Sequence, residues 1–213
     1  MKAFQNINGA VAYSAREYDI APETVITAGQ VVKLVDGLVV AAVAVETSDI
    51  LGVAAEYHAG KEDALNPRSD GKKILVYDAP GLVFICQAPI VEATGGDATS
   101  LVTAVAGTAD AYVGGYIKLI EKAEGSTNSD PVGKIDRVTA YADGTFTKAN
   151  GGTPAVGDKY AIFPPVGFVG GNLDASGERI ILTASTADFA LKVVGRDEGS
   201  NSIMLQATKH IFK

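Results

Sequence analysis

The side chains that most often carry chemistry are scarce in this sequence. There are two histidines and one cysteine, so few combinations of a nucleophile with an activating base exist. His58 follows an expected strand in EYHAG, and His210 lies in the terminal TKHIFK; both positions favour a surface or interface residue over a base. Cys86 lies in an apolar run, which favours a small buried residue. A single cysteine also excludes a disulfide within the chain.

Sequence motifs for metal and phosphate binding do not occur. The patterns HExxH, CxxC and HxH are missing, as are the Walker pattern and the G-x-S-x-G nucleophile elbow. The pairs Gly95-Gly96 and Gly170-Gly171 are interpreted as turns, because no lysine follows them and no helix is expected there. We therefore predict no metal site and no cofactor.

Carboxylates are the one catalytic group that the chain has in quantity, with 25 Asp and Glu residues. A glycosidase-like pair of carboxylates stays open from the sequence alone. Asp136, Asp143 and Asp158, or Asp197 with Glu198, also offer oxygen ligands for calcium, although the EF-hand loop is missing. Acidic turn residues usually accept hydrogen bonds from their own backbone instead. We therefore expect no catalytic residue and a protein that is not an enzyme.

Charge and hydropathy narrow the classes of partner. The formal net charge of −7 creates a field that repels phosphate backbones, so we expect no nucleic acid partner. The longest apolar run, residues 38–45, is far shorter than the roughly 20 residues of a membrane helix. Polar residues interrupt the N-terminal segment where a signal peptide would be apolar. We expect a protein made in the cytoplasm, with no membrane partner.

The elements that must position any site are predicted to be short β-strands joined by tight turns. Residues 26–87 set the pattern, because β-branched runs alternate with turn signals such as Asp36-Gly37 and Pro80-Gly81. No convincing amphipathic helix is evident. We predict an all-β fold with little helix: a small β-barrel or sandwich followed by a second β-rich region.

Three segments are expected along the chain. Residues 1–23 read as an N-terminal arm, either laid on the domain or offered to a partner. Residues 24–122 form the first β domain, and residues 123–213 a second β-rich domain or extension. Residues 123–131 are small, polar and rich in turn formers, so they are interpreted as a linker or loop at the boundary.

A family resemblance is carried by four stretches of the first domain. Residues 29–34 (GQVVKL), residues 50–54 (ILGVA), the strand at residues 74–77 and residues 81–83 resemble the small β-barrel of tailed-bacteriophage capsid decoration proteins, also called cement or head-stabilising proteins. In that family a G-x-x-V-x-L strand entry and an I-x-G-V-A strand recur. The resemblance covers residues 26–120, and the second half departs from the minimal pattern of the family.

The resemblance implies a structural, non-enzymatic virion protein. Such a protein binds the outer surface of the capsid, often as a trimer, and stabilises the junctions between capsomers; its partner is the major capsid protein. Its location is then the capsid exterior after synthesis in the host cytoplasm. Two alternatives stay open: another β-structured virion part (a head-fibre base, tail-tube or shell subunit), and a carboxylate-based hydrolase or carbohydrate-binding domain.

Aromatic and apolar residues are the candidates for partner binding, because such side chains concentrate at interface cores. A second interpretation is that they merely cap the β structure. The candidates are Phe4, Ile7, Tyr13 and Tyr18 in the arm, and Pro164, Pro165 and Phe168 as an exposed apolar group in the second region.

Overall fold

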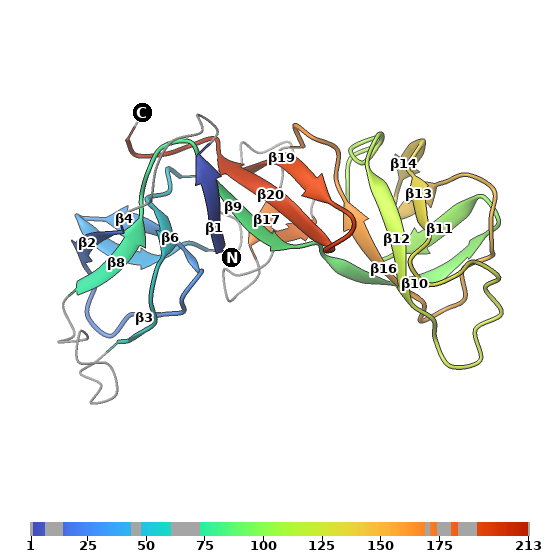
Figure 1. Cartoon of the computed structure of the whole chain (residues 1–213), viewed down its shortest axis with the longest axis horizontal. Coiled ribbons are helices and arrows are strands. Elements are labelled where there is room, and N and C mark those ends of the chain that lie inside the picture. Colours follow the sequence, from blue (N-terminus) through green and yellow to red (C-terminus); the bar gives the residue numbers. More distant parts are fainter. Residues whose placement is uncertain are drawn as a thin grey trace.

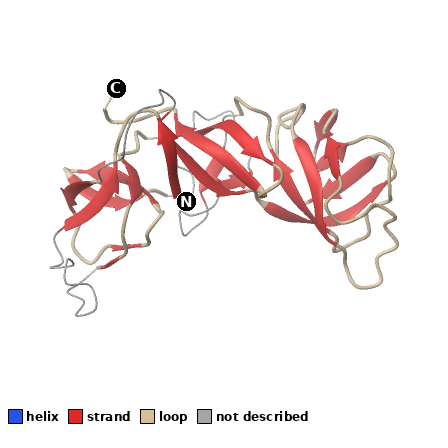
Figure 2. Cartoon of the chain, viewed as in Figure 1, coloured by secondary structure: helices blue, strands red, loops and turns tan. Residues whose placement is uncertain are grey.

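The computed structural model describes residues 2–6, 15–43, 48–60, 73–168, 171–173, 180–182 and 191–212. This part of the chain consists of strands, turns and loops without a helix, which confirms the predicted all-β fold (Figure 2). The strands gather in three groups along the long axis of an elongated molecule (Figure 1). Among the described residues we find no helix that could cross a membrane.

The first group, which we name the N-terminal sheet, is antiparallel. Asp36 and Gly37 have φ angles of 52° and 83°, the left-handed conformation that a two-residue hairpin turn requires, and this turn was predicted. A separate ribbon pairs β3 (Val25–Ile26) with β7 (His58–Ala59). In sheet order, the strands are β2 (Arg16–Asp19), β8 (Lys73–Tyr77), β6 (Gly52–Ala54), β4 (Val31–Val35) and β5 (Leu38–Ala41).

The outer edges of the N-terminal sheet approach each other without closing. A single parallel bridge joins Ile20 to Val39, and the Ala21 N–H donates to the Val39 carbonyl at 3.0 Å. The sheet is therefore curled rather than a closed barrel, and the arrangement is sandwich-like. Its interior is filled by buried aliphatic side chains: Ile20, Ile26, Val32, Val39, Leu51, Ala54, Ile74 and Val76.

The second group, the central sheet, joins the two ends of the chain. β9 (Leu82–Gln87) lies between β1 (Lys2–Asn6) and β20 (Ser202–Ala207), and β19 (Leu191–Asp197) follows as the outer strand. Cys86 on β9 is buried, as predicted. The pairing of β9 with β20 brings together segments that lie far apart in the sequence (Figure 1).

The third group, the distal sheet, has seven strands. β10 is shared along its length, because Ile90 to Glu92 pair with β16 and the residues from Ala93 pair with β11. The two outer strands are consecutive in the chain, so the sheet turns back on itself. In sheet order the strands are β13 (Ile135–Arg137), β12 (Tyr116–Glu121), β16 (Lys159–Phe163), β10 (Ile90–Asp97), β11 (Ser100–Thr103), β15 (Thr145–Thr147) and β14 (Ala140–Ala142). β17 (Gly171–Leu173) and β18 (Ile180–Leu182) form a separate pair.

A second hydrophobic core runs through the distal and central sheets. It also takes Val31, Ile50 and Val53 from the N-terminal sheet, whose neighbours in sequence, Val32 and Leu51, face the aliphatic core. Successive residues of a strand point to opposite faces, so this sheet is covered on both sides. The three groups are therefore held together by apolar packing.

Strand pairing does not follow the predicted domain boundaries. β12 and β16 lie on opposite sides of residues 122 and 123, yet they are neighbours in one sheet, with Ile117 opposite Ile162. The segment predicted as an arm contributes β1 to the central sheet and β2 to the N-terminal sheet. Its described parts are thus laid on the protein itself, which was one of the two alternatives.

Candidate functional site

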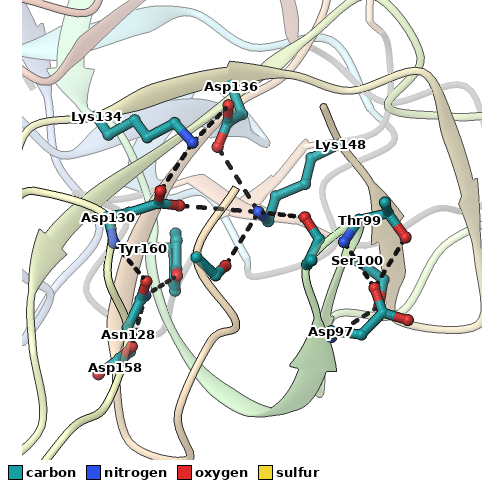
Figure 3. A network of polar contacts seen from close by, with 12 residues as sticks. Asp97, Thr99, Ser100, Asn128, Asp130, Lys134, Asp136, Lys148, Asp158 and Tyr160 are labelled. Carbon is teal, nitrogen blue, oxygen red and sulfur yellow. Dashed lines mark hydrogen bonds and ion pairs between the residues drawn. The ribbon is translucent and has the colours of Figure 1, made fainter. Parts of the chain in front are cut away.

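A cluster of polar side chains lies beside the distal sheet (Figure 3). It gathers residues from the loops around β13, from the segment after β15 and from the start of β16. The residues are Asn128, Asp130, Lys134, Asp136, Lys148, Asp158 and Tyr160, and we call them the polar network. A separate turn, in which Thr99 donates to Asp97, lies close by in the same view.

Lys148 is the more deeply buried of the two lysines in the network. Its side chain is 0% exposed, and its Nζ donates to the carbonyls of Ala98 at 3.2 Å and Gly152 at 3.3 Å. The Nζ also lies 3.8 Å from Oδ2 of Asp130 and 4.0 Å from Oδ2 of Asp136. Because these partners belong to three different loops, the ammonium group ties the loops together.

Lys134 completes a square of alternating charges. Its Nζ donates to Oδ1 of Asp130 at 2.9 Å and lies 3.6 Å from Oδ1 of Asp136. Each aspartate therefore has one lysine on each of its oxygens. The hydrogen bond to Asp130 is the main cause that raises the pKa of Lys134, and burial opposes it.

A second branch of the network is centred on Asp158, which is fully buried. The Asn128 side-chain amide donates to Oδ2 of Asp158 and to the Tyr160 hydroxyl, both at 2.9 Å. The backbone N–H groups of Ala123 and Ala155 donate to the same carboxylate at 2.9 Å and 3.1 Å. A buried carboxylate needs such donors, because an unpaired charge in the interior is very unfavourable.

The electrostatics of the network favour ionised carboxylates. Burial opposes ionisation of Asp130, but the hydrogen bond from Lys134, the Gly152 N–H and the nearby lysine charges outweigh it and lower its pKa. Burial likewise opposes ionisation of Asp158, and donors led by Asn128 outweigh it and lower the pKa. Burial raises the pKa of Tyr160 to about 12, against the hydrogen bond from Asn128.

The contacts of this arrangement join several loops, and its carboxyl groups have lowered pKa values. A general acid needs a raised carboxyl pKa, whereas every described Asp or Glu with a resolved shift has its pKa lowered: Asp97, Asp130, Asp158 and Asp197. Within the described ranges, no group of three or more His, Cys, Asp or Glu side chains could hold a metal ion. The calcium hypothesis for Asp136 and Asp158 therefore gains no support, since lysine or amide donors occupy their oxygens.

Two glycines make the network possible. A Cβ at Gly152 would overlap Oδ1 of Asn128, and a Cβ at Gly151 would overlap the Nζ of Lys134. The backbone of this turn can approach the network closely only because it carries no side chain at these two positions.

The predicted arm residues lie in different places. Tyr18 on β2 donates its hydroxyl to the buried carboxylate of Asp78, and burial together with this hydrogen bond raises the pKa of Tyr18 to about 12. Its hydroxyl is therefore engaged within the protein. Phe4 lies on β1, and its side chain, like the whole of Ile7 and Tyr13, is outside the described residues.

The second predicted group is not the exposed apolar cluster that we expected. Pro164 and Phe168 are buried, so the prediction that they are exposed is wrong, whereas Pro165 is partly exposed. Phe168 stacks on Tyr112, with ring centroids 5.2 Å apart, because the turn after β16 folds back onto the core. The turn exposes its tip at Val166, which is 61% accessible.

The histidines also differ from expectation, because His58 and His210 are 2% and 7% exposed. Both were predicted to be surface or interface residues, and both are buried within the chain. The motif search also missed Lys148 and Lys134 and treated residues 123–131 as a linker. The sequence signal around these lysines was the run of Asn, Ser, Asp and Gly residues. Such a run indicates turns, but it does not show that these turns meet in space.

Comparisons of the chain with models of protein families, with curated proteins and with solved structures found no match.

Proposed function

We propose that this protein is a structural component of a tailed-phage virion, which binds the outer surface of the capsid and stabilises the junctions between capsomers. The observation that carries the non-enzymatic part is the polar network. Its ionisable groups are engaged by one another or by the backbone, and its carboxyl pKa values are lowered rather than raised.

The strands that carry the family resemblance support the capsid part of the proposal. The GQVVKL and ILGVA stretches fall on β4 and β6, which pair with Val31 opposite Val53 and Val32 opposite Gly52. These residues supply both cores of the N-terminal sheet. The recurring residues of the motif thus have a shared structural role, and the acidic net charge of −7 suits a protein displayed densely on a DNA-filled shell.

A direct test measures binding to capsids. Shells of the virus that encodes the chain, purified without this protein, are mixed with the full-length chain and sedimented. We expect saturable co-sedimentation and bound protein in trimers around local threefold positions. Absence of binding at micromolar concentration would overturn the proposal. The full chain is needed, because deleting residues 1–19 would remove β1 and β2 from their sheets.

The partner-binding group at Pro164, Pro165 and Phe168 is tested through its exposed tip. If this turn contacts the shell, Val166→Asp weakens binding about tenfold or more, as a charge at an interface core would. Val156→Asp is the matched control, because Val156 is 71% exposed in another turn. Equal binding of the two variants would show that this turn is not part of the interface, and it would leave the proposal of capsid binding unchanged.

A further inference from the structure

The last residues of the described chain cross from the central sheet to the N-terminal sheet. Residues 208–212 follow β20, and we call them the C-terminal strap (Figure 1). The Ile50 N–H donates to the Lys209 carbonyl and the Ile211 N–H donates to the Ile50 carbonyl, both at 3.2 Å. Ile211 also packs against the aliphatic core of the N-terminal sheet. Backbone hydrogen bonds and the side chain of Ile211 therefore both hold the strap against the N-terminal sheet.

His210 lies at the centre of the strap, and its ring contacts both the ring and the backbone of Phe212. The Phe212 N–H donates to Nδ1 of His210 at 3.1 Å. An imidazole nitrogen that accepts a hydrogen bond carries no proton, so the proton of the neutral ring lies on Nε2. In the described part of the chain, Nε2 is buried without a hydrogen-bond partner. The hydrogen bond from Phe212 therefore favours the neutral ring, whereas the backbone of Leu51 favours the charged ring.

Protonation would remove the hydrogen bond that the ring accepts. In the charged ring both nitrogens are donors, so Nδ1 and the Phe212 N–H would oppose each other. The charge would also lie in a buried position, and burial disfavours the charged form of the ring. The local turn at residues 210–212 and the bridge from His210 to Ile50 are the contacts that this change disturbs first.

Charged groups on each neighbouring element act on this ring. Asp78 after β8 and Asp49 before Ile50 favour protonation, while Arg16 on β2 lies 3.6 Å from Asp78 and reduces its effect. The hydroxyl of Tyr18 also donates to Asp78, and Lys209 precedes the ring in the strap.

Burial lowers the pKa of His210, because it outweighs the backbone hydrogen bond with Leu51 and the two carboxylates, which act in the opposite direction. The folded-state pKa is thus below the unfolded value of about 6.5. The stability that the neutral ring contributes is present above about pH 6.5 and is lost as pH falls through the folded-state pKa.

We propose that the C-terminal strap is a pH-sensitive latch, in which protonation of His210 releases residues 209–212 from Ile50 and uncovers the adjoining edge of the N-terminal core. The proposal rests on the geometry of the strap and is independent of the proposed capsid function. It predicts that mild acid opens this contact while the distal sheet stays folded, because the buried charges there are Asp and Lys.

His58 provides a matched control within the same chain. It is the other histidine, it is buried, and it accepts the Gly60 N–H on Nδ1 at 3.1 Å, while its Nε2 has no hydrogen-bond partner among the described residues. However, it lies on β7 and its ring also contacts the Thr24 carbonyl at 3.2 Å. Replacement of His58 therefore removes an imidazole of similar local geometry without changing the strap.

The test is amide hydrogen exchange of the wild type, His210→Gln and His58→Gln at about pH 7 and about pH 5, with labelling times scaled for intrinsic exchange. In the wild type we expect the strap amides to exchange faster at the lower pH. The increase should be at most about thirtyfold, because a single histidine takes up the proton, with a pKa near 6.5 in the released strap. His58→Gln should keep this dependence and His210→Gln should lose it.

If His210→Gln detaches the strap at both pH values, a pH titration of the wild type is the test. The ring signals of His210 in NMR spectra must then change with the same midpoint as the exchange of the Ile211 and Phe212 amides. The latch proposal would be wrong if the two midpoints differ or if exchange does not change with pH. It would also be wrong if exchange is slower in acid, which a new ion pair between His210 and Asp78 would cause.

Discussion

Among the described residues, the buried side chains in the core of the N-terminal sheet are aliphatic, whereas the distal sheet encloses a group of aromatic rings and also carries the polar network. Tyr112 and Tyr141 meet edge to face with centroids 4.6 Å apart, and Phe146 lies 4.8 Å from Tyr141. The Tyr141 hydroxyl donates to the Val105 carbonyl at 2.7 Å. One region is thus held mainly by non-directional packing, and the other adds contacts that require specific geometry.

This difference predicts how substitutions in each region affect the stability of the protein. Apolar packing accepts side chains of similar volume with small losses, because the hydrophobic effect has no preferred direction. A buried ionic network does not, because the removal of one member leaves its partners charged and unpaired. We therefore expect substitutions in the two regions to differ in size, in location and in pH dependence.

The largest effect is expected from Lys148→Met in the polar network. It leaves Asp130 and Asp136 without their most buried partner and two backbone carbonyls without a donor. The free energy of unfolding should fall by about 4 kcal/mol, in the range for one broken buried ion pair. Urea denaturation at neutral pH measures this change. A loss below about 1 kcal/mol would show that solvent compensates the network.

A slightly smaller loss should follow from Ile74→Ala in the aliphatic core, by about 3 kcal/mol. The separation of the two cores predicts where this loss appears. Hydrogen exchange should accelerate for amides of β4, β6 and β8 and stay unchanged for β12 and β16. Equal acceleration in both regions would mean that the chain unfolds as one cooperative unit.

Asp158→Asn should destabilise the distal sheet by about 2 kcal/mol at neutral pH, because an amide cannot accept all the donors that surround Asp158. The wild-type carboxylate has a lowered pKa, so its contribution is present above the unfolded value of about 3.9 and is lost as pH falls through the folded-state pKa. Urea denaturation at about pH 7 and about pH 2.5 should show the difference between variant and wild type shrinking in acid. A difference that is constant with pH would contradict the assignment.

The smallest effects are expected from exposed ion pairs, and here the two regions should agree. Lys73 pairs with Glu17 at 2.8 Å in the N-terminal sheet, and Lys159 pairs with Glu121 at 3.1 Å in the distal sheet. Both pairs are well exposed, so Lys73→Met and Lys159→Met should each change stability by about 0.5 kcal/mol or less. A loss above about 1 kcal/mol for either variant would contradict this expectation.

Much of the fold was predictable because local signals suffice for it. Asp36-Gly37 requires a left-handed turn wherever it occurs between two β-branched runs, and the hairpin of β4 and β5 follows. The pairing of strands was harder to predict from the sequence. The boundary predicted near residue 122 followed a turn-rich segment, but β12 and β16 pair across it, because pairing depends on the whole sheet.

The sequence by itself determined the all-β class, the main turns, the burial of Cys86 and the acidic surface charge, since these depend on composition and on short-range patterns. Only the tertiary structure decided that Lys148 meets Asp130 and Asp136, that Phe168 turns inward onto Tyr112, and that His210 is buried beside Ile50. The physical reason is the same in each case. These contacts join segments whose approach depends on the packing of several sheets, and no local propensity encodes it.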